Sequence, residues 1–148
     1  MNISKLRTGV GIDAHQFGDS GPCSLAGLKW DDAPRLLGHS DGDAAVHALC
    51  DAVLSACQLG DIGTFFGVDK PEMAGASGVA MIEKLCDFVT SKGFVINNVS
   101  LQIVGNKPKI TPRRDEAQKV LSAALGAPVS VAATTSDQMG FTGRGEGI

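Results

Sequence analysis

The sequence contains no tyrosine, and aromatic residues make up only 5% of its 148 residues. Proteins that bind single-stranded nucleic acid stack the bases on aromatic side chains, so this composition argues against such a surface. The formal net charge of −3 also opposes sequence-independent binding to a polyphosphate backbone. A small phosphorylated ligand is still compatible with the composition, because it needs only a few well-placed cations.

The sequence also lacks a C-x-x-C pair, although it contains Cys23, Cys50, Cys57 and Cys86. Cys50 and Cys57 fall on one apolar helical stripe, which is typical of reduced thiols in a core and not of a zinc site. No apolar run is long enough to cross a bilayer, and the first residues do not have the pattern of a targeting segment. We therefore expect a single cytoplasmic domain that spans residues 1–148.

The hydrophobic periodicity predicts alternating strands and helices. Strands are expected at residues 8–12, 24–28, 99–103 and 129–134, where apolar and polar residues alternate. Helices are expected from residue 40 or 41 to Gly60, from 77 to 92 and from 111 to 125, each followed by glycine. Residues 61–75 are expected to form a loop, and residues 140–147 a glycine-rich tail. This order predicts an α+β fold of the α/β-sandwich type, with one mostly four-stranded sheet and helices packed on one face.

All three histidines lie within the first 47 residues, close to acidic residues and glycines. Asp13 and His15 are two apart at the end of an expected strand, so their side chains should point to the same face. His47 lies early on the next helix, at the border between its apolar stripe and solvent. Two imidazoles and a carboxylate that leave a fourth position open are the pattern of a catalytic zinc site. The alternatives are separate, partly buried histidines, or an iron site of the 2-His-1-carboxylate kind, which would require a β-barrel.

Two further segments have groups that suit phosphate. Residues 38–43 precede the helix of His47, and a helix N-terminus favours anions, with His39 and Ser40 as added donors. For Asp41 and Asp43 we favour a purely structural role as a cap and a first-turn acid. Residues 134–137 (Thr-Thr-Ser-Asp) end a strand and suit either hydrated Mg²⁺ with phosphate oxygens or a capped polar turn.

Two glycine-rich strings do not meet the requirements of nucleotide sites. Residues 9–14 fit G-x-G-x-x-A, but Gly18, Gly21 and Pro22 prevent the helix that a dinucleotide fingerprint must open. Residues 140–147 lack the Gly-Lys-Ser/Thr ending of a phosphate loop.

Several motifs in order, however, closely resemble one family from end to end. They are Asp13-x-His15, residues 38–43 with His47, residues 59–63 (Leu-Gly-Asp-Ile-Gly), Pro108-Lys109, Thr134-Thr135 and residues 143–147 (Gly-Arg-Gly-Glu-Gly). The family is that of the 2-C-methyl-D-erythritol 2,4-cyclodiphosphate synthases of the non-mevalonate isoprenoid pathway. The resemblance implies a homotrimer with active sites between subunits. It also implies a lyase that converts 4-diphosphocytidyl-2-C-methyl-D-erythritol 2-phosphate, a small phosphorylated cytidine substrate, into the cyclic diphosphate and CMP.

The resemblance also implies roles for individual residues. Asp13, His15 and His47 would bind one Zn²⁺ per subunit, and Asp137 would reach a second ion, Mg²⁺ or Mn²⁺, at the diphosphate. His39 and Thr135 would be catalytic, positioning the substrate and stabilising the transition state. The substrate-binding residues would be Asp13, Ala14, His15, His39, Ser40, Asp61, Ile62, Gly63, Phe66, Gly67, Val68, Asp69, Lys70, Gly105, Asn106, Lys107, Pro108, Lys109, Ile110, Thr111, Thr134, Thr135, Ser136, Asp137, Phe141 and Arg144.

The sequence departs from the family pattern at three places. Asp137 stands where many members have glutamate, residues 66–69 lack the usual Phe-Pro-Asp, and the family continues beyond Ile148 into a final strand, which we expect to be cut short here. Two other functions are compatible with the same residues. One is a zinc phosphodiesterase that activates water, and the other is a trimeric, non-enzymatic protein that binds prenyl diphosphates through Arg144.

Overall fold

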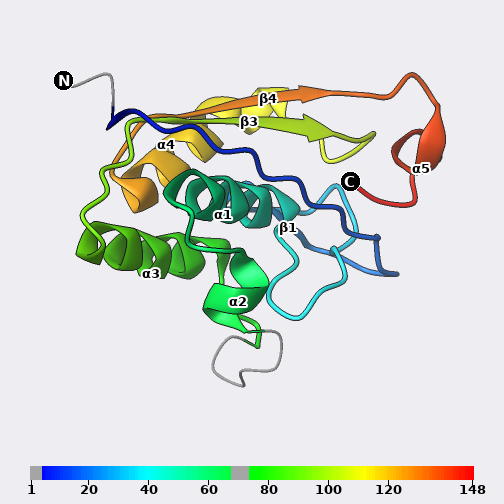
Figure 1. Ribbon diagram of the computed structural model, residues 1–148. Helices are drawn as coiled ribbons and strands as arrows, with labels where there is room; N and C mark the ends of the chain where they lie inside the picture. The colour runs from blue at the N-terminus through cyan, green and yellow to red at the C-terminus, as the bar shows by residue number, and fades with distance from the viewer. Residues whose placement is uncertain (1–4, 68–73) are drawn as a thin grey trace.

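A pair of parallel strands and three long helices form the body of the chain, whose computed structural model describes residues 5–67 and 74–148. The strands are β3 (Val99–Val104) and β4 (Val129–Thr134), and the helices are α1 (Ala44–Cys57), α3 (Gly78–Ser91) and α4 (Arg114–Leu125). In Figure 1, α1 lies below the strands, α4 runs from behind them to a position below them, and α3 lies beneath; both α1 and α4 contact α3. The helices therefore cover one face of the β3–β4 pair, as expected.

β3 and β4 pair in parallel from Val99–Val129 to Val104–Thr134, with α4 in the connection. Their inward residues Leu101, Ile103, Val129 and Val131 are buried, whereas the residues between them are more exposed. Such alternation is typical of a strand pair that has helices on one face only. Since both strands run in the same direction, the segments that follow Val104 and Thr134 emerge at the same edge.

A short hairpin packs near the start of α1. It consists of β1 (Cys23–Leu25) and β2 (Leu28–Trp30), joined by Ala26 and Gly27, whose φ angles are 51° and 77°. Two central residues with positive φ are what a two-residue hairpin turn of type I′ requires. The indole N–H of Trp30 donates to the carbonyl oxygen of Leu25 at 2.8 Å, so this buried side chain has no unsatisfied donor.

The expected four-stranded sheet is not found among residues 5–67 and 74–148. The described strands instead form two separate two-stranded sheets, β1–β2 and β3–β4. The segment expected as a strand at residues 8–12 forms no ladder, and the strand expected at 24–28 is a hairpin, because residues 26 and 27 turn the chain. Two short helices, α2 (Ile62–Phe66) and α5 (Gly140–Gly143), occupy segments expected as loop and tail, and a 3-10 turn, η3 (Thr111–Arg113), precedes α4.

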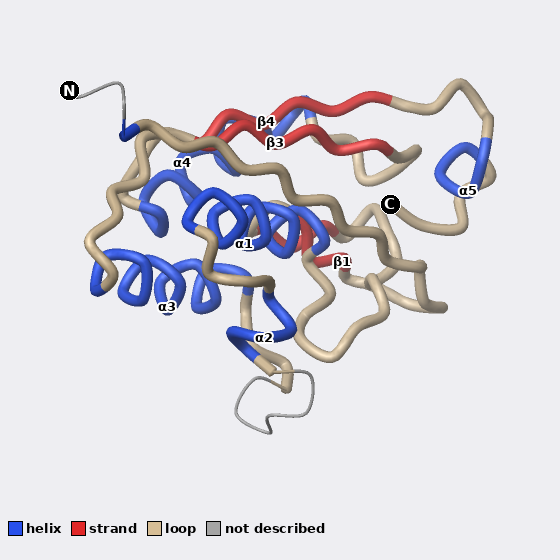
Figure 2. The backbone as a smooth tube through the Cα atoms, in the orientation of Figure 1, coloured by secondary structure: helices blue, strands red, loops and turns tan. Residues whose placement is uncertain are grey.

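The N-terminal segment lies directly along α1, as the tube in Figure 2 shows. A β-carbon on Gly9 would be 2.0 Å from the carbonyl oxygen of Ala52, and one on Gly11 would be 2.0 Å from that of Ala48. Only glycine allows this backbone-to-backbone approach. Because the glycines bring the chain close to α1, the residues that follow, Asp13 and His15, lie near the N-terminal part of this helix.

Caps mark several ends of the long helices, although α1 ends at Cys57, with Gln58 in the left-handed conformation, and not at the expected Gly60. The N-cap of α1 is Asp43, not Ser40 or Asp41, and its carboxylate accepts from the backbone N–H of Val46. Ser77 caps α3 in the same way, and Gly126 ends α4 in the left-handed conformation, as expected. No helix within the described part of the chain has the length and apolar character needed to cross a membrane.

Candidate metal centre and substrate site

Asp13, His15 and His47 converge as the sequence predicts. The Oδ2 atom of Asp13 lies 2.8 Å from Nε2 of His15 and 3.1 Å from Nδ1 of His47, and these two ring nitrogens are 3.0 Å apart. Within the described residues, this trio is the group of histidine, cysteine and acidic side chains close enough together to hold an ion. His47 is only 6% exposed, so it is buried and does not lie at the border with solvent that we expected.

The contacts within the trio shift the pKa values of Asp13 and His15 in opposite directions. Partial burial raises the pKa of Asp13, but the hydrogen bonds and charges of His15 and His47 outweigh burial and hold that pKa well below its usual range. The hydrogen bond to Asp13 raises the pKa of His15, against the opposing effect of burial. The metal-free site therefore favours an ionised carboxylate beside a protonated imidazole, an arrangement that a cation can replace.

The donor atoms fit a divalent transition metal. A tetrahedral zinc ion with bonds of about 2.0–2.1 Å separates its ligand atoms by roughly 3.3–3.4 Å. The three atoms here are 2.8–3.1 Å apart, so outward shifts of a few tenths of an ångström would admit the ion. Two imidazole nitrogens and one carboxylate oxygen suit zinc and its neighbours in the first transition row better than they suit Mg²⁺ or Ca²⁺.

The segment before α1 brings the second predicted group next to this centre. Ser40 is partly exposed, and its hydroxyl lies 2.9 Å from Nε2 of His47. His39 is exposed and is therefore free to meet a ligand. Asp41 and Asp43 have structural roles, as we favoured. Asp41 accepts from the backbone N–H groups of Asp43 and Gly78, and the fully buried Asp43 accepts from three others.

The predicted methylerythritol-binding residues lie around α2. Asp61 caps this helix through its hydrogen bonds with Thr64, which lower the pKa of the carboxyl group. Ile62, Gly63 and Gly67 are at least partly exposed, whereas the side chain of Phe66 is buried in the core, where a ligand would not reach it. Val68, Asp69 and Lys70 lie outside the described residues.

The predicted cytidine and diphosphate segments meet at the carboxyl edge of β3 and β4. The N–H of Gly105 donates to the carbonyl oxygen of Thr134 at 3.0 Å, which joins the two segments at their first residues. Of the cytidine segment, Lys107 and Lys109 are exposed and Pro108 and Ile110 are buried. The remaining members of that segment, Asn106 and Thr111, are partly exposed and exposed, respectively.

The diphosphate segment is open to solvent and continues into α5. Thr134, Thr135 and Asp137 are exposed, and the hydroxyl of Ser136 donates to the carbonyl oxygen of Met139 at 2.6 Å. Asp137 has a φ of 55° and is not part of the metal trio, so any ion that it binds is a separate one.

The last predicted positions lie in the C-terminal segment, which hydrogen bonds connect to the cytidine segment and to the metal ligands. The side-chain amide of Asn106 donates to the carbonyl oxygen of Gly143 at 2.9 Å, next to Arg144, which pairs with Glu146. Phe141 is 46% exposed. His15 exchanges two backbone hydrogen bonds of 3.0 Å with Ile148, which brings this C-terminal segment to the metal ligands. Ala14, between the two N-terminal ligands, is exposed.

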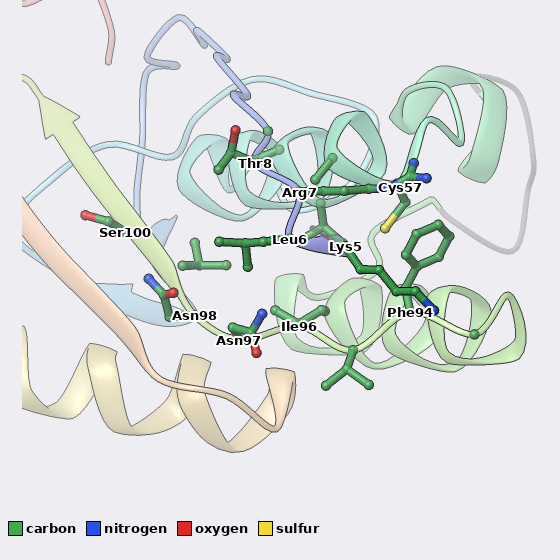
Figure 3. A pocket seen from close by; sticks show the side chains of 17 residues that line it. Lys5, Leu6, Arg7, Thr8, Cys57, Phe94, Ile96, Asn97, Asn98 and Ser100 are labelled. Atoms are coloured by element: carbon green, nitrogen blue, oxygen red, sulfur yellow. The ribbon is translucent and has the colours of Figure 1, made fainter. Parts of the chain in front are cut away.

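A large cavity in the described part of the chain does not coincide with the metal trio. It has a volume of about 640 Å³ and lies between the N-terminal segment, the C-terminal half of α1 and residues 93–100. Figure 3 shows Leu6, Phe94 and Ile96 lining it. This groove contains no metal ligand and no residue of the predicted substrate site, so the candidate site rests on donor chemistry and not on cavity size.

The sequence did not indicate two of the groups that hold the histidines. The carbonyl oxygen of Leu37 lies against Nδ1 of His15, and a backbone carbonyl has no signature in a sequence. The contact of Ser40 with His47 could have been anticipated from their seven-residue spacing only if the path of the intervening segment had been known.

Comparisons with known proteins give a consistent result. The chain matches the YgbB family over residues 6–148. A 2-C-methyl-D-erythritol 2,4-cyclodiphosphate synthase of Cutibacterium acnes is 52% identical over 145 residues, which cover 97% of this chain and 86% of that protein. A bifunctional IspD/IspF enzyme of Clavibacter michiganensis is also 52% identical over 145 residues, 98% of this chain, but the chain spans only 35% of that longer protein.

A solved structure gives the same relationship in three dimensions. It is that of a 2-C-methyl-D-erythritol 2,4-cyclodiphosphate synthase in a CDP-bound form, with a TM-score of 0.82 and 34% sequence identity. The match covers 88% of this chain and 89% of that one.

Proposed function

The chain belongs to the YgbB family of 2-C-methyl-D-erythritol 2,4-cyclodiphosphate synthases, and on this basis we propose that it performs their reaction. It converts 4-diphosphocytidyl-2-C-methyl-D-erythritol 2-phosphate to 2-C-methyl-D-erythritol 2,4-cyclodiphosphate and CMP. The observation that carries the proposal is the convergence of Asp13, His15 and His47 in a chain of this family. We place the activity in the cytoplasm and in isoprenoid precursor synthesis.

Asp13, His15 and His47 hold Zn²⁺ in this proposal. When bound, the ion acts as a Lewis acid that polarises a phosphoryl oxygen of the substrate. The fit is supported by the three donor atoms, which lie 2.8–3.1 Å from one another. Asp137, exposed beyond β4, holds a second ion, Mg²⁺ or Mn²⁺, together with the diphosphate oxygens.

The reaction needs no nucleophile from the protein. An oxygen of the 2-phosphate forms a bond to the β-phosphorus of the same molecule, and the bond from that phosphorus to the oxygen of CMP breaks. Well-oriented intramolecular reactions reach effective molarities of about 10⁵–10⁸ M, so orientation supplies much of the acceleration. We assign this orientation to His39 and Thr135, whose side chains are exposed and therefore accessible to a ligand.

The remaining predicted residues bind the two ends of the substrate. Residues 105–111 take the cytidine, which is supported by the CDP-bound form of a similar synthase. Residues 61–63 and 66–70 take the methylerythritol part; within this group, the buried side chain of Phe66 leaves its backbone as the part available for contact. Phe141 and Arg144 lie at further substrate or subunit-contact positions.

We further propose that the chain forms a homotrimer whose active sites lie between subunits. Val10 and Ile12 are 77% and 83% exposed, and they alternate with the two glycines that face α1. They therefore point away from the core as an apolar surface that a second copy can cover. Residues from neighbouring copies would then complete the site around each metal.

Product analysis tests the function. The purified chain is incubated with the diphosphocytidyl substrate, Zn²⁺ and Mg²⁺, and the products are followed by ³¹P NMR and chromatography. Equal amounts of cyclic diphosphate and CMP are expected. A linear monophosphate would instead indicate a phosphodiesterase, and the absence of turnover would favour a binding protein.

The substitution His47→Ala tests the metal site. It should abolish zinc binding and turnover while leaving a folded protein, because it removes one of three ligands. Full activity in metal-stripped protein would contradict the zinc assignment.

A further inference from the structure

One short segment, Leu37–Ser40, contacts both candidate ligand histidines. It meets the ring nitrogen of each histidine that does not face Asp13. The carbonyl oxygen of Leu37 lies against Nδ1 of His15, and the hydroxyl of Ser40 lies 2.9 Å from Nε2 of His47. In each ring the opposite nitrogen faces Asp13. Each imidazole therefore has one nitrogen toward the metal position and one toward this segment.

The tautomer of His15 follows directly from its partner. A carbonyl oxygen can only accept a hydrogen bond, so Nδ1 of His15 must donate. In the neutral ring, Nε2 then has a lone pair, and this is the atom 2.8 Å from the carboxylate of Asp13. The hydrogen bond to Leu37 thus leaves the lone pair of the neutral His15 ring on Nε2, the atom that faces the metal position.

The tautomer of His47 depends on Ser40. A metal bound through Nδ1 of His47 leaves the proton on Nε2, inside a side chain that is only 8% exposed. A buried donor without a partner costs about 1–3 kcal/mol. The contact with Ser40 satisfies that donor, since a hydroxyl can accept up to two hydrogen bonds while it still donates one.

The position of Ser40 is itself fixed by neighbouring carboxylates. Asp41 accepts from the N–H of Gly78 at 3.0 Å, which fastens the segment to the start of α3. Asp43 accepts from Ala26, Gly27 and Val46, which fastens it to the hairpin and to α1. Ser40 thus lies on a segment fastened to three elements, not on a free loop.

We propose that Ser40 is a positioning residue of the metal centre: its hydroxyl accepts the Nε2–H of His47 and so reserves Nδ1 for the ion. The same hydroxyl keeps its own proton for a phosphate oxygen of the substrate, so one side chain links the ion to the reacting group. The proposal rests on the metal site assigned above and adds to it a group that does not touch the metal.

The test compares isosteric variants in substrate-free protein. Ser40→Thr keeps the hydroxyl, whereas Ser40→Val has the same branched shape without it. The dissociation constant for Zn²⁺ is measured by competition with a chromophoric chelator, and Co²⁺ absorption reports the ligand geometry. Loss of a hydrogen bond behind a ligand histidine typically weakens metal binding by about 10–100-fold. We expect that loss for Ser40→Val, with an altered Co²⁺ spectrum, and affinity close to that of the unmodified protein for Ser40→Thr.

Controls separate the possible failures. Ser91→Ala removes an exposed hydroxyl that donates to the carbonyl oxygen of Phe88, and it should leave Zn²⁺ affinity unchanged. Melting temperatures of metal-free Ser40→Thr and of the unmodified protein should agree, since both keep the hydroxyl that contacts His47. If His47→Ala binds Zn²⁺ normally, the metal site itself is wrong. If His47→Ala loses Zn²⁺ but Ser40→Val and Ser40→Thr bind it equally well, the proposed role of Ser40 at the metal is overturned. A changed KM of Ser40→Val for the substrate, with unchanged Zn²⁺ affinity, would then assign Ser40 to substrate binding alone.

Discussion

The carboxylate of Asp13 lies between two imidazole rings, and this contact governs how the metal-free protein responds to pH. The hydrogen bond from His15 to Asp13 raises the pKa of His15 above its ordinary value, and the same contacts lower that of Asp13. We expect the ring protons of His15 to titrate above about 6.5 in NMR spectra of metal-free protein. Asp13→Asn should bring the pKa back toward that value; an unchanged titration in this variant would contradict the assignment.

The same shifts set the pH range in which the pair stabilises the fold. The contribution of His15 is fully present below the unfolded pKa of about 6.5 and is lost as the pH rises through the raised folded pKa. The contribution of Asp13 is present above an unfolded pKa of about 3.9 and is lost as the pH falls through its lowered folded pKa. The pair therefore stabilises the metal-free protein most between the two unfolded pKa values, from about pH 3.9 to about pH 6.5.

Gly11 determines where those ligands lie. A β-carbon at this position would be 2.0 Å from the carbonyl oxygen of Ala48 and 2.6 Å from the nitrogen of Ala52, both in the backbone of α1. Gly11→Ala should destabilise the protein by about 1–3 kcal/mol and weaken Zn²⁺ binding, because Asp13 follows two residues later. Chemical denaturation and chelator competition measure the two effects.

A matched substitution at Gly63 is the control. A β-carbon there meets only Asp61, at an ordinary 3.4 Å, and Gly63 lies within α2, so Gly63→Ala should not destabilise the protein. Equal stabilities for the two variants would show that the N-terminal segment does not need its close approach to α1.

At the scale of residues, the sequence indicated which side chains form the metal site, but it did not indicate all of the residues that they contact. The spacing of Asp13 and His15 predicts a shared face, and their atoms do meet. The burial of His47 was missed, because the segments that cover it come from distant parts of the chain. Asp43 was expected to be a simple first-turn acid, yet its carboxylate joins the hairpin turn to α1. Such a contact depends on a tertiary path that the local pattern does not contain.

The start of α1 is the point where several elements are joined. Asp43 is fully buried and accepts from Ala26 and Gly27 in the hairpin and from Val46 in the helix. Asp43→Ala removes the N-cap and leaves buried N–H groups unsatisfied, so we expect a loss of roughly 3–5 kcal/mol in the free energy of unfolding. Urea denaturation provides the measurement.

Asp19 offers a comparison on the surface. It is an exposed aspartate, and Asp19→Ala should change the free energy of unfolding by no more than about 0.5 kcal/mol. A similarly small change for Asp43→Ala would mean that the hairpin does not depend on this carboxylate.

Among the elements, the long helices were predictable and the pairing of strands was not. α1, α3 and α4 bury residues three and four apart, so their periodicity was visible in the sequence. The hairpin, α2 and α5 are each so short that glycines, turns and caps decide them, and a periodic pattern cannot be recognised over so few residues. Residues 8–12 alternate as a strand does, but alternation alone does not supply a partner strand.

At the scale of the whole molecule, the exposed apolar residues of the N-terminal segment suggest self-association. We expect the unmodified chain to sediment as a trimer. Val10→Asp places a charge on the proposed contact and should shift the chain to smaller species, because burying an unpaired carboxylate is unfavourable. Sedimentation velocity at several concentrations measures this change.

The control for that experiment lies on a different layer of the molecule. Thr90 is exposed on α3, so Thr90→Asp should leave the assembly unchanged. A monomeric unmodified chain, or a Val10→Asp variant that remains trimeric, would contradict the proposed interface.

The hairpin that Asp43 holds also contains the single tryptophan of a chain without tyrosine. Trp30 is 2% exposed, its ring lies under the guanidinium group of Arg113, and its N–H is bound to Leu25. Intrinsic fluorescence therefore comes almost entirely from one indole in a dry, defined environment. A red shift of its emission reports exposure of the hairpin to water, so a single optical signal can follow the opening of this region without any added dye.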